Sequence, residues 1–272
     1  RPPRSTLFPY TTLFRSVLFR STASGVVNLA LLNDGGIYVT EVRIGKVRGR
    51  DVTLSLDRGM ALLDPENAGD VDIAATDNLT IYTTYGGWTN IGTQDNPLEI
   101  TVGGKFLAAT RDENGARTNT NFKLFLNVPT GNLDATATDI SLVEMDTPAI
   151  IHVLNGDLTV GDVRANRLEL VASGNITLGN IVLSTRTEQY NIRAGRDLTI
   201  GGISFNTIVQ RSIELIAGGN QTVEGGTKTW TSFLMQAGGD LHLKGQVTVS
   251  PSARLTLVAG RDAILESVLN NY

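Results

Sequence analysis

The chain lacks cysteine and has only two histidines, His152 and His242, among its 272 residues. The absence of cysteine excludes a disulfide framework, a cysteine nucleophile and thiolate metal ligands. Neither histidine has a carboxylate at the spacing of the His-Glu-x-x-His motif, and neither a Gly-x-Ser-x-Gly elbow nor a phosphate-binding loop occurs. We therefore predict no catalytic, cofactor-binding or metal-binding residue and no enzymatic activity, and we expect both histidines to be strand residues.

Long apolar runs and excess positive charge are also missing. No run approaches the roughly 18 apolar residues that a membrane-spanning helix needs. The net charge is −4, and four of the 23 basic residues (Arg1, Arg4, Arg15 and Arg20) fall in the opening stretch, which leaves 19 basic against 27 acidic residues in the rest. An acidic body disfavours nucleic acid and anionic membranes as partners. We expect neither nucleic acid binding nor membrane insertion.

A repeat of about twenty residues occupies the second half of the chain. Its form is apolar-x-apolar-x-Ala, a turn that contains glycine, Asp or Asn, and then apolar-x-apolar. Examples are "YNIRAGRDLTIGGI" (190–203) and "SFLMQAGGDLHLKGQV" (232–247). The repeated alanines are Ala172, Ala194, Ala217, Ala237 and Ala259. A fixed period of this length is the signature of a repeat architecture.

The alternation of apolar residues predicts strands. Pairs such as Leu168/Leu170 and Leu198/Ile200 are expected to point inward, and residues between them, such as Glu169, to face solvent. A short third strand is expected around the inward residues Val163, Ile181, Ile203 and Val247. We expect the corner glycines to supply a positive φ, and the Asp or Asn that follows to bond the turn backbone.

Short strands and corners within about 22 residues leave no room for a helix, which excludes leucine-rich repeats and βαβ units. A sandwich of hairpins would not place equivalent residues at one fixed short period. We therefore predict an all-β parallel β-helix, or β-solenoid, with coils of about 20–23 residues stacked about 4.8 Å apart. Residues 22–272 are expected to form one such domain, with a loop excursion near residues 110–121, where the apolar alternation stops.

The repeated acidic residues permit two interpretations. Four aspartates recur at the same corner, and asparagine takes their place in two other coils; they are Asp157, Asp197, Asp240, Asp262, Asn175 and Asn220. A polysaccharide-active β-helix would need two carboxyl groups about 5–9.5 Å apart in a groove. A structural ladder needs one acceptor per coil and tolerates an amide, so the asparagines favour the ladder. Tyr85 and Trp88 could stack on sugar, but core or corner packing is the expected role.

The recurrent corners "AGRDLTI" (194–200), "AGRDAIL" (259–265) and "AGGDLHL" (237–243), with "GGIYVTEV" (35–42) and "IGTQDNPLEITVGG" (91–104), resemble large adhesins of the filamentous-haemagglutinin type. The resemblance implies a right-handed β-helical shaft that is secreted or exposed on the surface of Gram-negative bacteria. It also implies host or neighbouring-cell receptors or glycans as partners, and an outer-membrane transporter. Alternative functions are a pectinase-like enzyme and the stem of a secreted toxin or haemolysin.

Residues 1–21, "RPPRSTLFPYTTLFRSVLFRS", share neither the alternation nor the acidity of the repeat. Pro9, Tyr10, Thr11 and Thr12 interrupt any apolar core, which argues against a secretory signal. The stretch resembles a translated short-read sequencing adapter, which would explain why "LFRS" occurs twice. We therefore interpret residues 1–21 as a non-native segment and expect it to be disordered.

Overall fold

The structure is a computed structural model, and it describes residues 16–31, 41–56, 61–63, 71–84, 89–111, 117–118, 122–136, 138, 140–142, 148–165, 167–183, 189–205 and 213–270. These residues form strands β1 to β28 and contain no helix. Apart from the short β10–β11 pair, the strands are paired in parallel and stack as a β-solenoid. The predicted all-β fold with parallel coils is confirmed.

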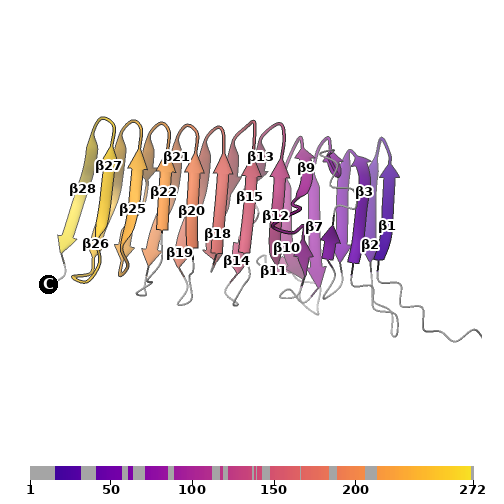
Figure 1. Cartoon of the computed structure of the whole chain (residues 1–272), viewed down its shortest axis with the longest axis horizontal. Coiled ribbons are helices and arrows are strands. Elements are labelled where there is room, and N and C mark those ends of the chain that lie inside the picture. The colour runs from indigo at the N-terminus through magenta and orange to yellow at the C-terminus, as the bar shows by residue number, and fades with distance from the viewer. Residues whose placement is uncertain are drawn as a thin grey trace, which may run out of the picture.

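One layer of the solenoid, here called the first face, is a 13-stranded sheet. Its strands are β1 (Ser16–Thr22), β3 (Glu41–Gly49), β5 (Ala61–Leu63), β6 (Ile73–Ala75), β8 (Asn90–Ile91), β9 (Leu98–Val102), β12 (Lys123–Val128), β15 (Pro148–Val153), β18 (Arg167–Ala172), β20 (Gln189–Ala194), β22 (Ile213–Ala217), β25 (Phe233–Ala237) and β27 (Leu255–Ala259). Figure 1 shows these strands side by side, with the colour running from one end of the molecule to the other.

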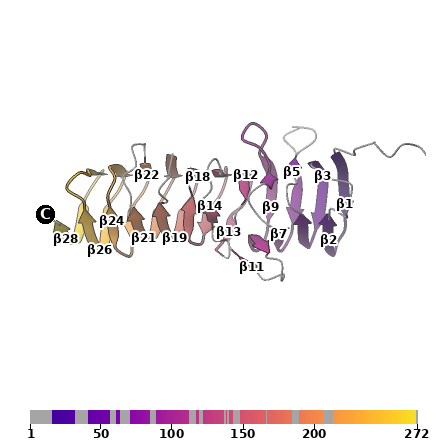
Figure 2. The ribbon, with the colours of Figure 1, turned by 90° about the horizontal axis from the view of Figure 1, so that it is seen from below.

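The second face consists of two sheets, which a bridge between Lys105 and Asp134 connects. The five-stranded sheet contains β2 (Val26–Leu31), β4 (Asp51–Leu56), β7 (Leu79–Thr84), β10 (Phe106–Arg111) and β11 (Arg117–Thr118). The ten-stranded sheet contains β13 (Leu133–Ala135), β14 (Ile140–Leu142), β16 (Leu158–Val160), β17 (Val163–Ala165), β19 (Ile176–Leu183), β21 (Leu198–Phe205), β23 (Gln221–Val223), β24 (Thr227–Thr229), β26 (Leu241–Val249) and β28 (Ala263–Asn270). Figure 2 shows both layers from below.

The five repeated alanines form one column along the first face. Ala172 pairs with Ala194, Ala194 with Ala217, Ala217 with Ala237, and Ala237 with Ala259. The sequence spacings of 22, 23, 20 and 22 residues therefore each correspond to one coil. The predicted coil length is confirmed for this half of the chain.

Apolar side chains fill the space between the two faces, as the alternation predicted. Leu168, Leu170, Leu198 and Ile200 are fully buried. The predicted third strand is only partly correct. Val163, Ile181 and Ile203 do share one inward column, but β19 and β21 run continuously through it, whereas β16 and β17 are separate strands.

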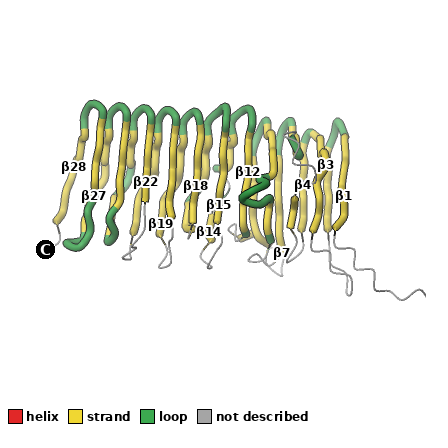
Figure 3. Tube along the Cα trace, in the orientation of Figure 1, coloured by secondary structure: helices red, strands yellow, loops and turns green. Residues whose placement is uncertain are grey.

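The corner glycines act differently from the prediction. Among the described glycines, only Gly92 and Gly131 have a positive φ. A Cβ atom on Gly218 would instead lie 2.3 Å from the carbonyl oxygen of Gly195, one coil earlier. Glycine is therefore required at this corner because the backbones of successive coils approach too closely for a side chain. Figure 3 shows these corners as the row of tight loops along one edge.

Part of the opening stretch contradicts the expected disorder. Residues 1–15 lie outside the described part of the chain, but Ser16–Thr22 forms β1 and pairs in parallel with β3. The exposed edge of β3 presents backbone N–H and C=O groups, to which an extended segment can pair through its backbone alone. Such pairing does not depend on side chains, so it leaves the origin of residues 1–21 untested.

A loop excursion was expected near residues 110–121. The described residues of this segment instead extend the second face. Thr110 and Arg111 end β10, and they pair in antiparallel fashion with Thr118 and Arg117 of β11. Residues 112–116 and 119–121 lie outside the described part of the chain. Nearby, the guanidinium of Arg111 lies 3.6 Å from the centroid of the Tyr82 ring, a cation–π contact on the outer surface.

Candidate functional site: the corner ladder

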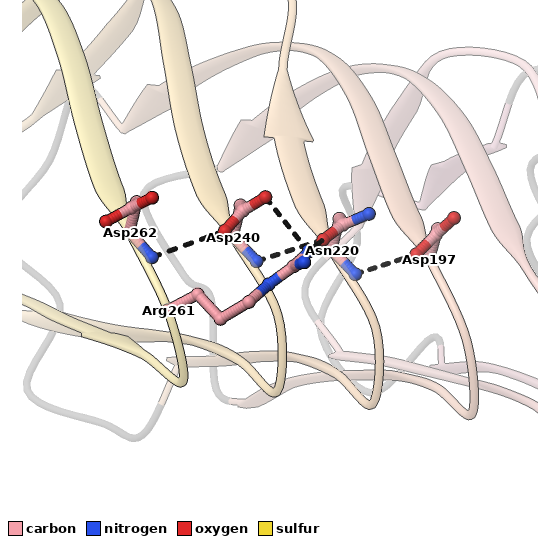
Figure 4. Close-up of polar contacts among 5 residues, drawn as sticks. All are labelled: Asp197, Asn220, Asp240, Arg261 and Asp262. Carbon is pink, nitrogen blue, oxygen red and sulfur yellow. Dashed lines mark hydrogen bonds and ion pairs between the residues drawn. The ribbon is translucent and has the colours of Figure 1, made fainter.

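The acidic and amide residues at the tight corners form a continuous hydrogen-bonded row, here called the corner ladder. The side-chain Oδ1 of each member accepts the backbone N–H of the equivalent residue one coil later. The links are Asn132 to Asp157 (2.9 Å), Asp157 to Asn175 (2.6 Å), Asn175 to Asp197 (3.1 Å), Asp197 to Asn220 (2.7 Å), Asn220 to Asp240 (2.9 Å) and Asp240 to Asp262 (3.3 Å). Figure 4 shows the last part of this row.

The four aspartates singled out in the sequence all belong to the ladder. The structural role of the ladder also explains why asparagine occupies the equivalent position in other coils. Only an oxygen acceptor on a short side chain is needed, and Asp and Asn both provide one. Each corner N–H pointing to the previous coil would otherwise lack a protein partner. The net contribution of one such bond is about 0.5–1.5 kcal/mol.

A basic side chain fastens the ladder near its end. The Nη2 atom of Arg261 lies 3.0 Å from Asn220 Oδ1 and 3.0 Å from Asp240 Oδ2, so it spans two coils. The side chains of Arg261 and Asp240 are 63% and 38% exposed, so solvent screens this ion pair. Both oxygens of Asp240 are therefore engaged, one by the Asp262 N–H and one by Arg261.

A shorter ladder in the first half of the chain follows the same principle. Asn78 Oδ1 accepts the N–H of Lys105 at 3.0 Å, and Asn78 Nδ2 donates to Asp51 Oδ1 at 2.9 Å. The hydrogen bond from Asn78, together with Arg50, holds the pKa of Asp51 below its usual value. The lysine side chain has no oxygen acceptor, so Lys105 cannot accept a backbone N–H from the next coil, and the row of hydrogen bonds ends there. Its register partner in the next coil is Asp134 rather than the ladder residue Asn132, a difference of two residues.

Both histidines lie in strands, as predicted, and each pairs with a glutamate that the sequence analysis missed. His152 Nε2 lies 2.9 Å from Glu169 Oε1, and His242 Nε2 lies 2.9 Å from Glu266 Oε1. Each glutamate belongs to the next coil, two residues out of register with the histidine. The one-coil spacing could have revealed these pairs, because it brings residues about twenty apart into contact.

Tyr190 is the largest fully buried side chain among the described residues, and the sequence analysis missed the role of its hydroxyl. Its hydroxyl donates to the carbonyl of Ala165 at 2.8 Å and accepts the N–H of the same residue at 2.9 Å. Burial raises the pKa of Tyr190 well above its usual value. The hydroxyl thus pairs two backbone groups at the end of β17 and has a structural role.

The geometry of a glycosidase is met in one respect only. Asp240 and Asp262 occupy adjacent coils, so their backbones stand about 4.8 Å apart, close to the carboxyl separation of retaining glycosidases. The Asp240 carboxylate is already used within the ladder, because one oxygen accepts the Asp262 N–H and the other pairs with Arg261.

The described residues contain no group of three or more His, Asp or Glu side chains that could hold a metal ion. None of the described residues belongs to a helix that is long and apolar enough to cross a membrane. Tyr85 and Trp88, considered for stacking on sugar, lie outside the described part of the chain.

Comparison of the chain with protein-family models, with curated proteins and with solved structures found no match. The strand pairing itself defines the class of the chain as a parallel β-solenoid.

Proposed function

We propose that the chain is a shaft segment of a large bacterial filamentous adhesin, secreted or displayed on the cell surface. The observation that carries this proposal is the corner ladder. Recurrent carboxylates are the residues that a catalytic β-helix would use. Here the carboxylates of Asp157, Asp197 and Asp240 each accept the backbone N–H of the equivalent residue in the following coil. They are used for stacking, which is what a shaft requires.

The outer surface supports the same proposal. Solvent-facing positions of the second face carry Thr159, Thr177, Thr199 and Thr222, which are paired from coil to coil. Such a surface is polar and repetitive and has few aromatic anchors. It suits contact with cell-surface receptors or glycans along the length of a shaft. The resemblance of the corner sequences to filamentous-haemagglutinin adhesins adds an outer-membrane transporter as the export partner.

A polysaccharide-active enzyme is the second candidate, because Asp240 and Asp262 lie in adjacent coils. The two functions are separated by immobilising the whole chain on beads. Bead adhesion to cultured epithelial and bacterial cells is then measured beside the release of reducing ends and unsaturated products from pectin and polygalacturonate.

We expect the native chain to promote adhesion above heat-unfolded chain and to release no product. Product release that disappears in an Asp240→Asn variant would establish the enzyme instead. Adhesion no greater than that of unfolded chain, with no product, would also contradict the adhesin proposal.

A further inference from the structure

Trp230 is the one aromatic residue among the large hydrophobic side chains that are exposed in the described part of the chain. It is 45% exposed, whereas Phe205 and Phe233 on either side of it in the sequence are buried. Trp230 lies directly after β24, between Thr229 and Thr231, and both threonines are buried. Because the neighbouring side chains point inward, the indole points outward.

The turn that carries Trp230 is held by the coils on both sides of it. The Trp230 N–H donates to the Phe205 carbonyl of the preceding coil at 3.0 Å, and the Ser250 N–H of the following coil donates to the Thr229 carbonyl at 2.9 Å. Within the turn, the Thr231 N–H donates to Thr229 Oγ1 at 3.1 Å, and this hydroxyl donates to the Thr231 carbonyl at 2.6 Å. The indole is therefore presented on a fixed backbone, so little conformational freedom is lost when a ligand binds.

A cation without an acidic partner lies beside the indole. Lys228 is exposed, pairs in register with Ser204 and Thr248, and forms no ion pair with any described residue. Glu224 is the one acidic residue in the sequence between 221 and 232. Lys244 of the next coil already binds both oxygens of Glu224 at 2.9 Å. The charge of Lys228 is therefore available to an anion from solution.

Hydroxyl groups complete this surface, here called the Trp230 patch (Lys228, Trp230, Ser250 and Ser252). Lys228 and Trp230 are two residues apart on the same outer side, about 6.5 Å along the strand. Ser250 and Ser252 follow β26 at the same turn of the next coil, and their Oγ atoms lie 3.2 Å apart. A hydroxyl can both donate and accept. The patch therefore combines an aromatic face with a few convergent polar groups, as small-ligand sites do.

We propose that the Trp230 patch binds a hexuronic acid unit of an acidic polysaccharide. The indole would stack on the C–H face of the pyranose ring, since these hydrogens carry partial positive charge and the face of an aromatic ring is negative. The Lys228 ammonium would pair with the carboxylate, which projects from the edge of a hexuronate ring and leaves the C–H face free to stack. This inference rests on the proposed function, for which it names the class of glycan.

The probes are fluorescent trigalacturonate and its methyl ester, whose anisotropy is followed while the full 272-residue chain is added. We expect saturable binding of both, about threefold weaker for the uncharged ester. Trp230→Ala should weaken the binding of both probes about fivefold, and Trp230→Phe should restore most of it. Lys228→Gln should weaken the binding of the acid alone. Lys244→Gln is the matched control, because Glu224 already pairs with that lysine.

Three results would overturn this proposal, with circular dichroism spectra unchanged in every variant. They are equal affinity for the acid and the ester, undiminished binding by Trp230→Ala, and no binding at all. Tighter binding of sialyllactose than of trigalacturonate would also overturn it, because the ligand would then be a different acidic sugar. The bead assay is read separately. Adhesion without trigalacturonate binding contradicts this inference alone, whereas binding without adhesion contradicts the adhesin proposal alone.

Discussion

At the scale of single residues, the tight corners use two small features for two different purposes. Asp or Asn supplies an acceptor that reaches the next coil, and glycine allows the backbones to approach. The sequence made the first purpose predictable, because amide and carboxylate alternate at one position. The prediction for the second purpose was wrong, because a repeated glycine is equally consistent with a positive φ and with a close approach of backbones, and only the structure distinguishes the two.

Gly218→Ala should destabilise the fold. The new Cβ would lie 2.3 Å from the Gly195 carbonyl oxygen, and relieving this overlap should cost about 1–3 kcal/mol in the free energy of unfolding. Gly25→Ala is the matched control, since nothing lies within 4 Å of its added Cβ. Urea unfolding followed by circular dichroism measures both. Equal stability of the two variants would contradict the close-approach explanation.

Tyr190→Phe should lower stability by about 1–3 kcal/mol, because the Ala165 N–H and C=O lose their buried partner. The ring itself is kept, so loss of packing does not contribute. The urea midpoint gives the result, and Tyr82→Phe is the control, since its ring lies on the outer surface beneath Arg111. A midpoint for Tyr190→Phe as high as that of Tyr82→Phe would contradict the role given to the hydroxyl.

At the scale of strands and coils, the parallel β-solenoid was predictable for both halves of the chain, but the register was predictable only for the second half. The alanine spacing fixed the register from β18 to β27, where each coil repeats its corner. In the first half, β5 and β6 share one level of the first face, as do β8 and β9, and the segments between them break the period. The sequence signal weakened there because these insertions shift the equivalent residues.

The change of register between the two halves occurs at β13, the strand that contains Asp134. The Thr136 hydroxyl donates to Asp134 Oδ1 at 2.5 Å and holds the pKa of this carboxyl below its usual value. Because the folded pKa is lowered, this stabilisation is present above the ordinary aspartate pKa and is lost as the pH falls through the folded value.

Thr136→Val should therefore raise the pKa of Asp134 toward its ordinary value and bring the acid-induced loss of stability to higher pH. Carboxyl-carbon NMR titration follows the pKa directly, and the melting temperature between neutral and acidic pH follows the stability. Thr159→Val, on the neighbouring strand, is the control. An unchanged Asp134 titration in Thr136→Val would show that the hydroxyl does not stabilise the carboxylate.

At the scale of the whole molecule, the chain is a stack of coils that the corner ladder joins at one edge. The ladder was hypothesised from sequence, but its direction was not, because only the structure shows that each side chain reaches forward to the next coil. Arg261, which spans two coils, was not anticipated either. The proposed shaft function depends on this use of the carboxylates, since a residue committed to stacking is not free for catalysis.

Residue-resolved amide hydrogen exchange at the corners tests this central claim most directly. The Asp240 N–H donates to Asn220 Oδ1 at 2.9 Å, so it should be protected in the native chain and in Asn220→Asp. Asn220→Ala should expose that amide while the strand amides of β25 and β26 keep their protection. Exchange at Asp240 that is equally slow in all three proteins would contradict the account, since the corner side chain would then not be what joins the coils.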